Sequence, residues 1–149
     1  MSTTTTTLND LIETLKDGQE GFRAAAADVK ASDLKTLFGE LSLQRSKFAG
    51  ELQALAHGLG EKNPADSGSA AGALHRGWIN LKAALVKQDI HAVLSECERG
   101  EDVAVSAYQK ALEESDLDGN VVETLRRQYM QVQASHDRVK SLRDSMAPQ

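Results

Sequence analysis

The sequence predicts an all-α protein built from four long helices and one short helix. Apolar residues recur at intervals of three and four over long stretches, which is the spacing of a helix with one buried face. Aromatic residues make up only 4% of the chain, and there are only two prolines, Pro64 and Pro148. Because sheets favour aromatic residues and proline interrupts helices, this composition favours long, unbroken helices.

The first two long helices are predicted over residues 8–29 and 33–58. Residues 1–7 contain a run of threonines and are predicted to be a flexible N-terminus, with Thr7 as the cap of the first helix. Ser32 is the predicted cap of the second helix. Both are residues whose side-chain oxygen accepts a hydrogen bond from the first turn of a helix.

A long connection over residues 59–89 follows, and a short helix is predicted within it over 71–87. The last two long helices are predicted over 90–114 and 120–146. Asp89 is expected to cap the first of these, and the sequence DLDG separates the two.

The lengths of the connections predict how the helices are arranged. Short connections join the first two long helices and the last two, so each pair should form an antiparallel hairpin. Residues 59–89 are long enough to travel back along the whole bundle, which would leave the second and third long helices parallel. A four-helix bundle with one such crossover has the ferritin-like topology. We therefore expect a single ferritin-like domain over residues 1–149.

The composition excludes several classes of function. The chain has 17 basic and 22 acidic residues, a net charge of −5, which argues against a nucleic-acid-binding protein. No stretch is apolar for long enough to span a membrane, and the N-terminus lacks the basic start and apolar run of a secretory signal. A cytoplasmic location is expected. The single cysteine, Cys97, excludes an internal disulfide and is expected to be a buried thiol.

The core-facing line of each long helix is apolar at both ends and interrupted by polar residues near its midpoint. In an antiparallel bundle the midpoints lie at a similar height, so these residues should meet in one buried polar layer. They are Gln19, Gln44, Arg45, Glu101, Gln133 and His136. A buried carboxylate needs a partner, and Arg45 is the natural ion-pair partner of Glu101.

The polar layer has two interpretations. In the first it is structural, with Glu101 in an ion pair and His136 a hydrogen-bonded core histidine. In the second, Glu20, Glu40, Glu101 and His136 bind iron or manganese, because carboxylate oxygens and imidazole nitrogens suit these metals. Arg45 and Gln133 are poor ligands, so the structural interpretation leads and no cofactor is expected.

Several blocks of the sequence resemble an uncharacterised bacterial family of ferritin-like four-helix-bundle proteins. These blocks are LIETLKDGQEGF, QRSKFAGELQALAHGLG, GSAAGALHRGWINLK, ECERGEDVAVSAY and QASHDRVKSLRD, and the resemblance covers about residues 8–144. The resemblance implies the fold of ferritin and rubrerythrin relatives in a domain of unknown function. It implies that Glu101, followed by Tyr108, is similar to the helix-three glutamate of rubrerythrin-like proteins. Gln133 and His136 would take the place of their last Glu-x-x-His pair.

This sequence departs from the di-iron pattern in two places. It has no histidine at the matching position of the second helix, and it has an amide at Gln133. Both departures argue against oxidase, ferroxidase and iron-storage activity.

The crossover contains His75, Arg76 and Trp78. Trp78 is most simply an anchor that packs the crossover onto the bundle, while the three together could instead form a surface for a ligand or partner. The leading hypothesis is a non-enzymatic ferritin-like bundle that self-associates, most simply as a dimer. The alternatives are a di-metal or mono-metal oxidoreductase, and a stress-associated binding protein that recruits an unknown protein partner through the crossover.

Overall fold

The protein is all-α in a computed structural model, which describes residues 3–62, 64–65, 78 and 80–146. The helices in this part of the chain are α1 (Thr3–Asp28), α2 (Ser32–Gly58), α4 (Leu81–Lys87), α5 (Ile90–Leu112) and α6 (Gly119–Asp144). No strand occurs among the described residues. The predicted fold class is therefore confirmed at this level.

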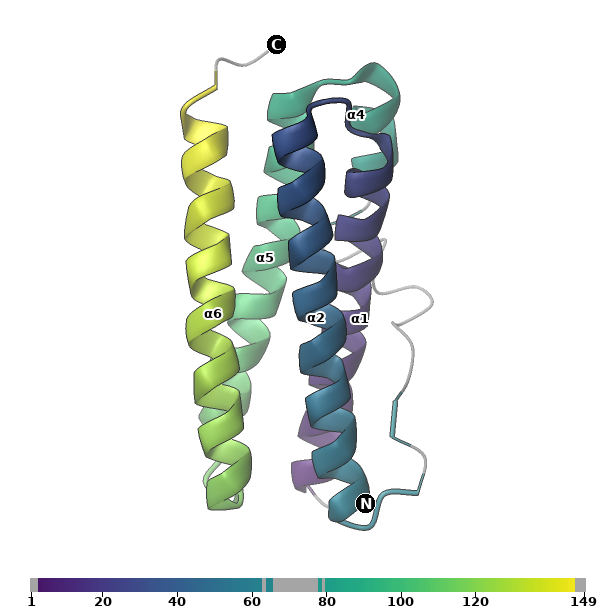
Figure 1. The fold of residues 1–149 in the computed structure, drawn as a ribbon. Helices are drawn as coiled ribbons and strands as arrows, with labels where there is room; N and C mark the ends of the chain where they lie inside the picture. The colour runs from purple at the N-terminus through teal and green to yellow at the C-terminus, as the bar shows by residue number, and fades with distance from the viewer. Residues whose placement is uncertain (1–2, 63, 66–77, 79, 147–149) are drawn as a thin grey trace.

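The four long helices lie side by side, and α4 lies at the end where α1 turns into α2 (Figure 1). α1 packs on α2 and on α5, and α6 packs on α5 and on α2. Within the described residues, α2 and α5 make no direct backbone contact, so they occupy opposite corners of the assembly. Figure 1 shows α2 and α5 running in the same direction, while α1 and α6 run in the opposite one.

Three helix ends test the predicted caps. α1 begins at Thr3, so the prediction that Thr3–Thr7 precede the helix was wrong; Thr5 and Leu8 are buried, and this packing draws the threonine run into the helix. The residue before α2 is Ala31, which makes no side-chain cap bond, so Ser32 is not the cap. Asp89 is confirmed as a cap, because its side chain accepts a hydrogen bond of 3.1 Å from the Ala92 amide.

The short helix of the crossover begins later than predicted. α4 starts at Leu81, and Trp78 and Asn80 precede it. The remainder of the predicted start, residues 71–77 and 79, lies outside the described residues, as do His75 and Arg76.

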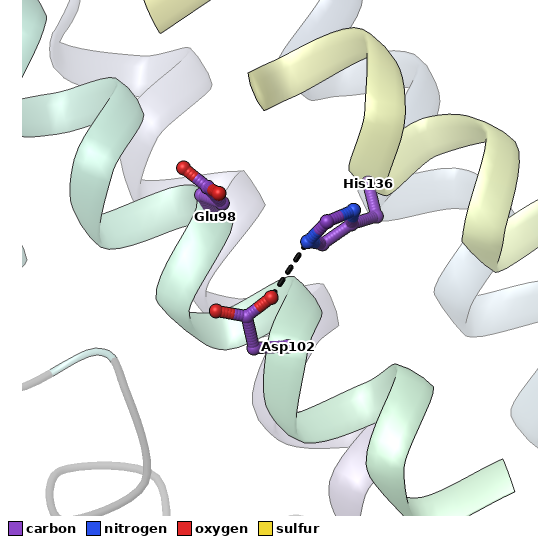
Figure 2. Close-up of side chains that lie close together, drawn as sticks. All are labelled: Glu98, Asp102 and His136. Carbon is purple, nitrogen blue, oxygen red and sulfur yellow. Dashed lines mark hydrogen bonds and ion pairs between the residues drawn. The ribbon is translucent and has the colours of Figure 1, made fainter. Parts of the chain in front are cut away.

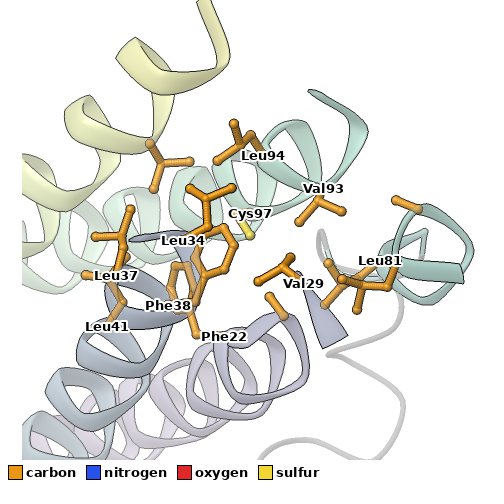
Figure 3. Close-up of a cluster of buried hydrophobic side chains, with 14 of the residues drawn as sticks. Phe22, Val29, Leu34, Leu37, Phe38, Leu41, Leu81, Val93, Leu94 and Cys97 are labelled. Atoms are coloured by element: carbon orange, nitrogen blue, oxygen red, sulfur yellow. The ribbon is translucent and has the colours of Figure 1, made fainter. Parts of the chain in front are cut away.

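The hydrophobic core consists of two clusters, one toward each end of the helices. The cluster at the α4 end contains both aromatic and aliphatic side chains, among them Phe22, Leu41, Leu94 and Cys97 (Figure 3). The cluster at the opposite end includes Leu15, Phe48, Ala104 and Val132.

On each long helix, the last buried apolar side chain of one cluster and the first of the other are seven positions apart, with six residues between them. Seven residues are two helical turns, so the interrupted stretches of all four helices lie at one level. The buried residues of these stretches include Gly18, Arg45, Glu101 and Ser135, one from each long helix.

Trp78 anchors the crossover on α1 and α5. Its indole lies against Gly21 and Gly100, and a β-carbon built on either glycine would come within 2.4 Å or 2.2 Å of ring atoms. The indole also meets the ring of Phe22 edge-on at a centroid distance of 5.2 Å. Only residues without side chains leave room for this ring, so the two glycines form a slot for Trp78.

Candidate functional site

The centre of the protein holds a closed polar network formed by Arg45, Glu101 and Ser135. Arg45 is 1% exposed and Glu101 is fully buried. One Nη of Arg45 forms an ion pair with Glu101 Oε1 and donates a 2.8 Å hydrogen bond to Ser135 Oγ. The Ser135 hydroxyl lies 2.6 Å from Glu101 Oε2, as a donor to it. Both oxygens of the carboxylate are therefore engaged by side chains from other helices.

Neighbouring residues position the guanidinium. Its Nε donates a hydrogen bond of 3.1 Å to the side-chain oxygen of Gln44, and its carbon lies 5.4 Å from the centroid of the Phe22 ring. A cation above an aromatic face is attracted by the ring's electrons, more strongly where water is excluded. On α1, Gly18 faces the arginine, and a β-carbon there would lie 3.5 Å from Nη1, an ordinary contact distance.

This network does not fit a di-metal centre of the kind that a ferritin-like fold would imply. A guanidinium has five N–H donors, no acceptor and a permanent positive charge, so it cannot ligate a cation. Glu101, the interior carboxylate best placed to ligate a metal, already balances that charge. The arrangement at the core is a neutral ion pair rather than an open coordination site.

Two of the four predicted metal ligands lie on the surface, so the structure does not bring the four together at one place. Glu20 is exposed and pairs with Arg23 on the same helix at 2.5 Å. Glu40 is exposed on α2. Successive helical residues are about 100° apart, so a residue two positions from Gly18 points well away from the interior.

His136 also lies outside the polar network, and Ser135 takes the position in the core that was predicted for it. The imidazole is on the outer side of the α5–α6 contact, where Nε2 lies 2.6 Å from Asp102 Oδ1 and Nδ1 lies 3.1 Å from Asp137 Oδ1. Burial lowers the pKa of His136, but its hydrogen bonds with Asp137 and Asp102 outweigh this and raise the pKa above its ordinary value. The expected contact between Glu101 and His136 is thus replaced by one with Asp102.

The other predicted members of the polar layer lie at its edges. Gln19 and Gln133 are half-buried, and the Gln133 amide donates to Asp137 at 3.2 Å rather than pointing inward. Gln44 is half-buried beside Arg45.

A second buried polar contact was not predicted. The Tyr108 hydroxyl donates a hydrogen bond of 2.7 Å to the side-chain oxygen of Gln128, and both residues are fully buried. Burial raises the pKa of Tyr108. Gln128 lies three residues after Leu125 on the core-facing line, and that spacing was the signal that could have identified it.

A group of potential metal ligands lies beside His136. Among the described residues, the ligand atoms of Glu98, Asp102 and His136 all lie within 4.8 Å of one another (Figure 2). Glu98 and Asp102 are one turn apart on α5, and this i, i+4 pair of acids was the sequence signal that was overlooked.

A comparison with protein-family models finds a match over most of the chain. Residues 3–114 match the family described as a domain of unknown function, DUF2383. The chain belongs to this family. A comparison with curated proteins finds no match. No helix in the described part of the chain is long and apolar enough to cross a membrane.

The matched part of the DUF2383 chain includes Arg45 and Glu101 but ends before α6. The charged pair therefore lies within the region that defines the family, while Ser135 and His136 lie after it. Since the description of DUF2383 contains no activity, the function has to follow from the geometry of the site.

Proposed function

We propose that this protein is a ferritin-like helical bundle that acts as a non-enzymatic structural or binding protein. In this proposal a buried ion pair takes the place of a di-metal centre. The observation that carries it is the network of Arg45, Glu101 and Ser135, which fills the level of the core where such a centre would otherwise lie.

The arrangement of the long helices supports the ferritin-like part of the proposal. The chain passes from the end of α2 to the start of α5 through a long connection, and these two helices run in the same direction (Figure 1). A bundle with a single long crossover between its second and third helices has this pattern of directions.

The state of the central groups supports the absence of catalysis there. A catalytic acid must be able to give a proton to a substrate or to water, and a catalytic base must be able to take one. Glu101 has no exposed surface, and its two oxygens are held by Arg45 and Ser135. A substrate would have to break a buried ion pair to reach this carboxylate, which costs several kcal/mol.

Elemental analysis tests the proposal. The full chain, purified without added metal and again after aerobic addition of ferrous iron, should contain well under one iron or manganese atom per chain in its interior. The same measurement on His136→Gln removes any contribution from the outer surface. Two iron atoms per chain, retained in that variant, would overturn the proposal.

Self-association as a dimer is part of the same proposal. Leu43 on α2 and Met130 on α6 are large apolar side chains that are largely exposed, and the proposal places the second copy against them. Light scattering coupled to size exclusion measures the mass directly, and a monomer at all concentrations would contradict this part.

A further inference from the structure

The outer face of the α5–α6 contact brings together three side chains that the proposed function does not use. Glu98 and Asp102 project from the same side of α5, and His136 approaches them from α6 (Figure 2). Their ligand atoms lie within 4.8 Å of one another. Two carboxylates and one imidazole from two rigid helices are a compact set of oxygen and nitrogen donors.

His136 is already oriented for ligation. Its ring is only 15% exposed, and Nδ1 lies 3.1 Å from Asp137 Oδ1, so this nitrogen can donate its proton to that carboxylate. Nε2 then faces Asp102 at 2.6 Å. Metal-binding histidines are commonly fixed in this way, with the second ring nitrogen hydrogen-bonded to a carboxylate.

Glu98 is the most buried member of the group, with 8% of its surface exposed. Its Oε2 forms an ion pair with Arg143 from the end of α6. Arg143 is 27% exposed and also contacts Asp144 at 2.7 Å, so it can turn outward and remain paired. A buried carboxylate is stable only beside a cation or hydrogen-bond donors, and Arg143 would compete with a metal ion for the place beside Glu98.

We propose that Glu98, Asp102 and His136 bind one divalent transition-metal ion, such as Zn²⁺, with water completing the coordination. Mixed imidazole and carboxylate donors suit such ions. Ligand bonds of about 2.0–2.2 Å place ligand atoms roughly 3.3 Å apart in a tetrahedral site. The three atoms therefore need only small side-chain rotations, and the metal takes the place of the proton between His136 and Asp102.

This site is independent of the central network. Glu101 and Asp102 are neighbours on α5, and consecutive helical side chains point about 100° apart. Glu101 faces Arg45 in the core, whereas Asp102 is exposed on the outside. A metal at the outer site leaves the interior ion pair intact, so the two proposals can fail separately.

Isothermal titration calorimetry of the chelator-treated full chain with ZnCl₂ tests the proposal. Wild type should bind one equivalent, and Asp102→Asn and His136→Gln should each weaken binding by at least about tenfold. His57→Gln, an exposed histidine at the end of α2, is the matched control and should bind like wild type. Circular dichroism checks that each variant is folded.

Arg143→Gln separates a metal site from a merely structural cluster. Removing the competing cation beside Glu98 should strengthen zinc binding several-fold, although it removes an ion pair from the protein. The proposal is overturned if wild type shows no binding at millimolar zinc. It is equally overturned if Asp102→Asn and His136→Gln both bind like wild type, or if His57→Gln alone loses the ion.

Discussion

Replacing Arg45 with methionine should destabilise the protein more than any surface substitution. Methionine keeps the length of the aliphatic stem and its packing near Phe22 but removes the charge. Glu101, which has no exposed surface, would keep only the hydrogen bond from Ser135. Leaving a buried charge without its partner costs about 3–5 kcal/mol. For a chain of this length, that corresponds to a fall in Tm of roughly 6–20 °C.

The double variant shows whether this loss arises from the pair itself. In Arg45→Met combined with Glu101→Leu, no charge remains at the centre, and Ser135 can still donate to the Val132 carbonyl at 2.8 Å. Replacing a buried ion pair by apolar residues of similar volume is often close to neutral. Urea unfolding followed by circular dichroism should therefore place the double variant within about 1–2 kcal/mol of wild type.

Two results would refute this reasoning. One is an Arg45→Met variant that loses less than about 1 kcal/mol, because the charge of Glu101 would then be solvated or paired elsewhere. The other is strict additivity of the two single substitutions in the double variant, since residues that share an ion pair must show a coupling energy.

Three further predictions concern other parts of the molecule. Gly100→Ala should lower the free energy of unfolding in urea by about 1–3 kcal/mol, because its methyl group would clash with the indole of Trp78. The fluorescence of Trp78, the single tryptophan, should shift to the red. The control Gly50→Ala has open space around its β-carbon and should instead stabilise the protein by about 0.5–1 kcal/mol. An unshifted emission in Gly100→Ala would contradict the slot. The pKa of His136, measured by NMR, should lie above the ordinary histidine value. The charged imidazole then contributes its full stabilisation at pH values below the unfolded-state pKa of about 6.5, and this contribution disappears as the pH rises through the folded-state pKa. A pKa below about 6.5 would be inconsistent with the two carboxylate contacts of His136. Burial raises the pKa of Cys97 well above its ordinary value, so a thiol reagent should modify the native protein far more slowly than the urea-unfolded chain, and equal rates would disprove the burial.

The four long helices and their approximate bounds could be predicted from the sequence because buried faces impose the 3.6-residue period over long stretches. The start of α1 could not, since threonine has modest helix propensity and only the burial of Thr5 draws the run into the helix. The pairing of Arg45 with Glu101 could be predicted from their opposite charges and from their similar positions along the axis of the bundle. The role of Ser135 could not be predicted, because His136 is the next residue and the sequence pattern places it equally well at the edge of the core-facing side of the helix. Consecutive residues of a helix point about 100° apart, so one of two neighbouring residues can face the core while the other faces the surface. The spacing of apolar residues does not show which of Ser135 and His136 faces the core.

The location of the ion pair explains why an arginine, rather than a shorter or apolar residue, is useful at the centre. α2 and α5 lie at opposite corners and make no direct backbone contact in the described part of the chain. Arg45 reaches across the core from one of these helices to Glu101 on the other, and Ser135 adds α6 to the same network. Two helices that pack through apolar side chains alone can shift by one turn relative to each other and still pack. A buried charged side chain reaches its partner at only one relative position of the two helices. On the remaining helix, α1, Arg45 lies over the Phe22 ring and beside Gly18, so this one side chain contacts or pairs with residues of all the other long helices.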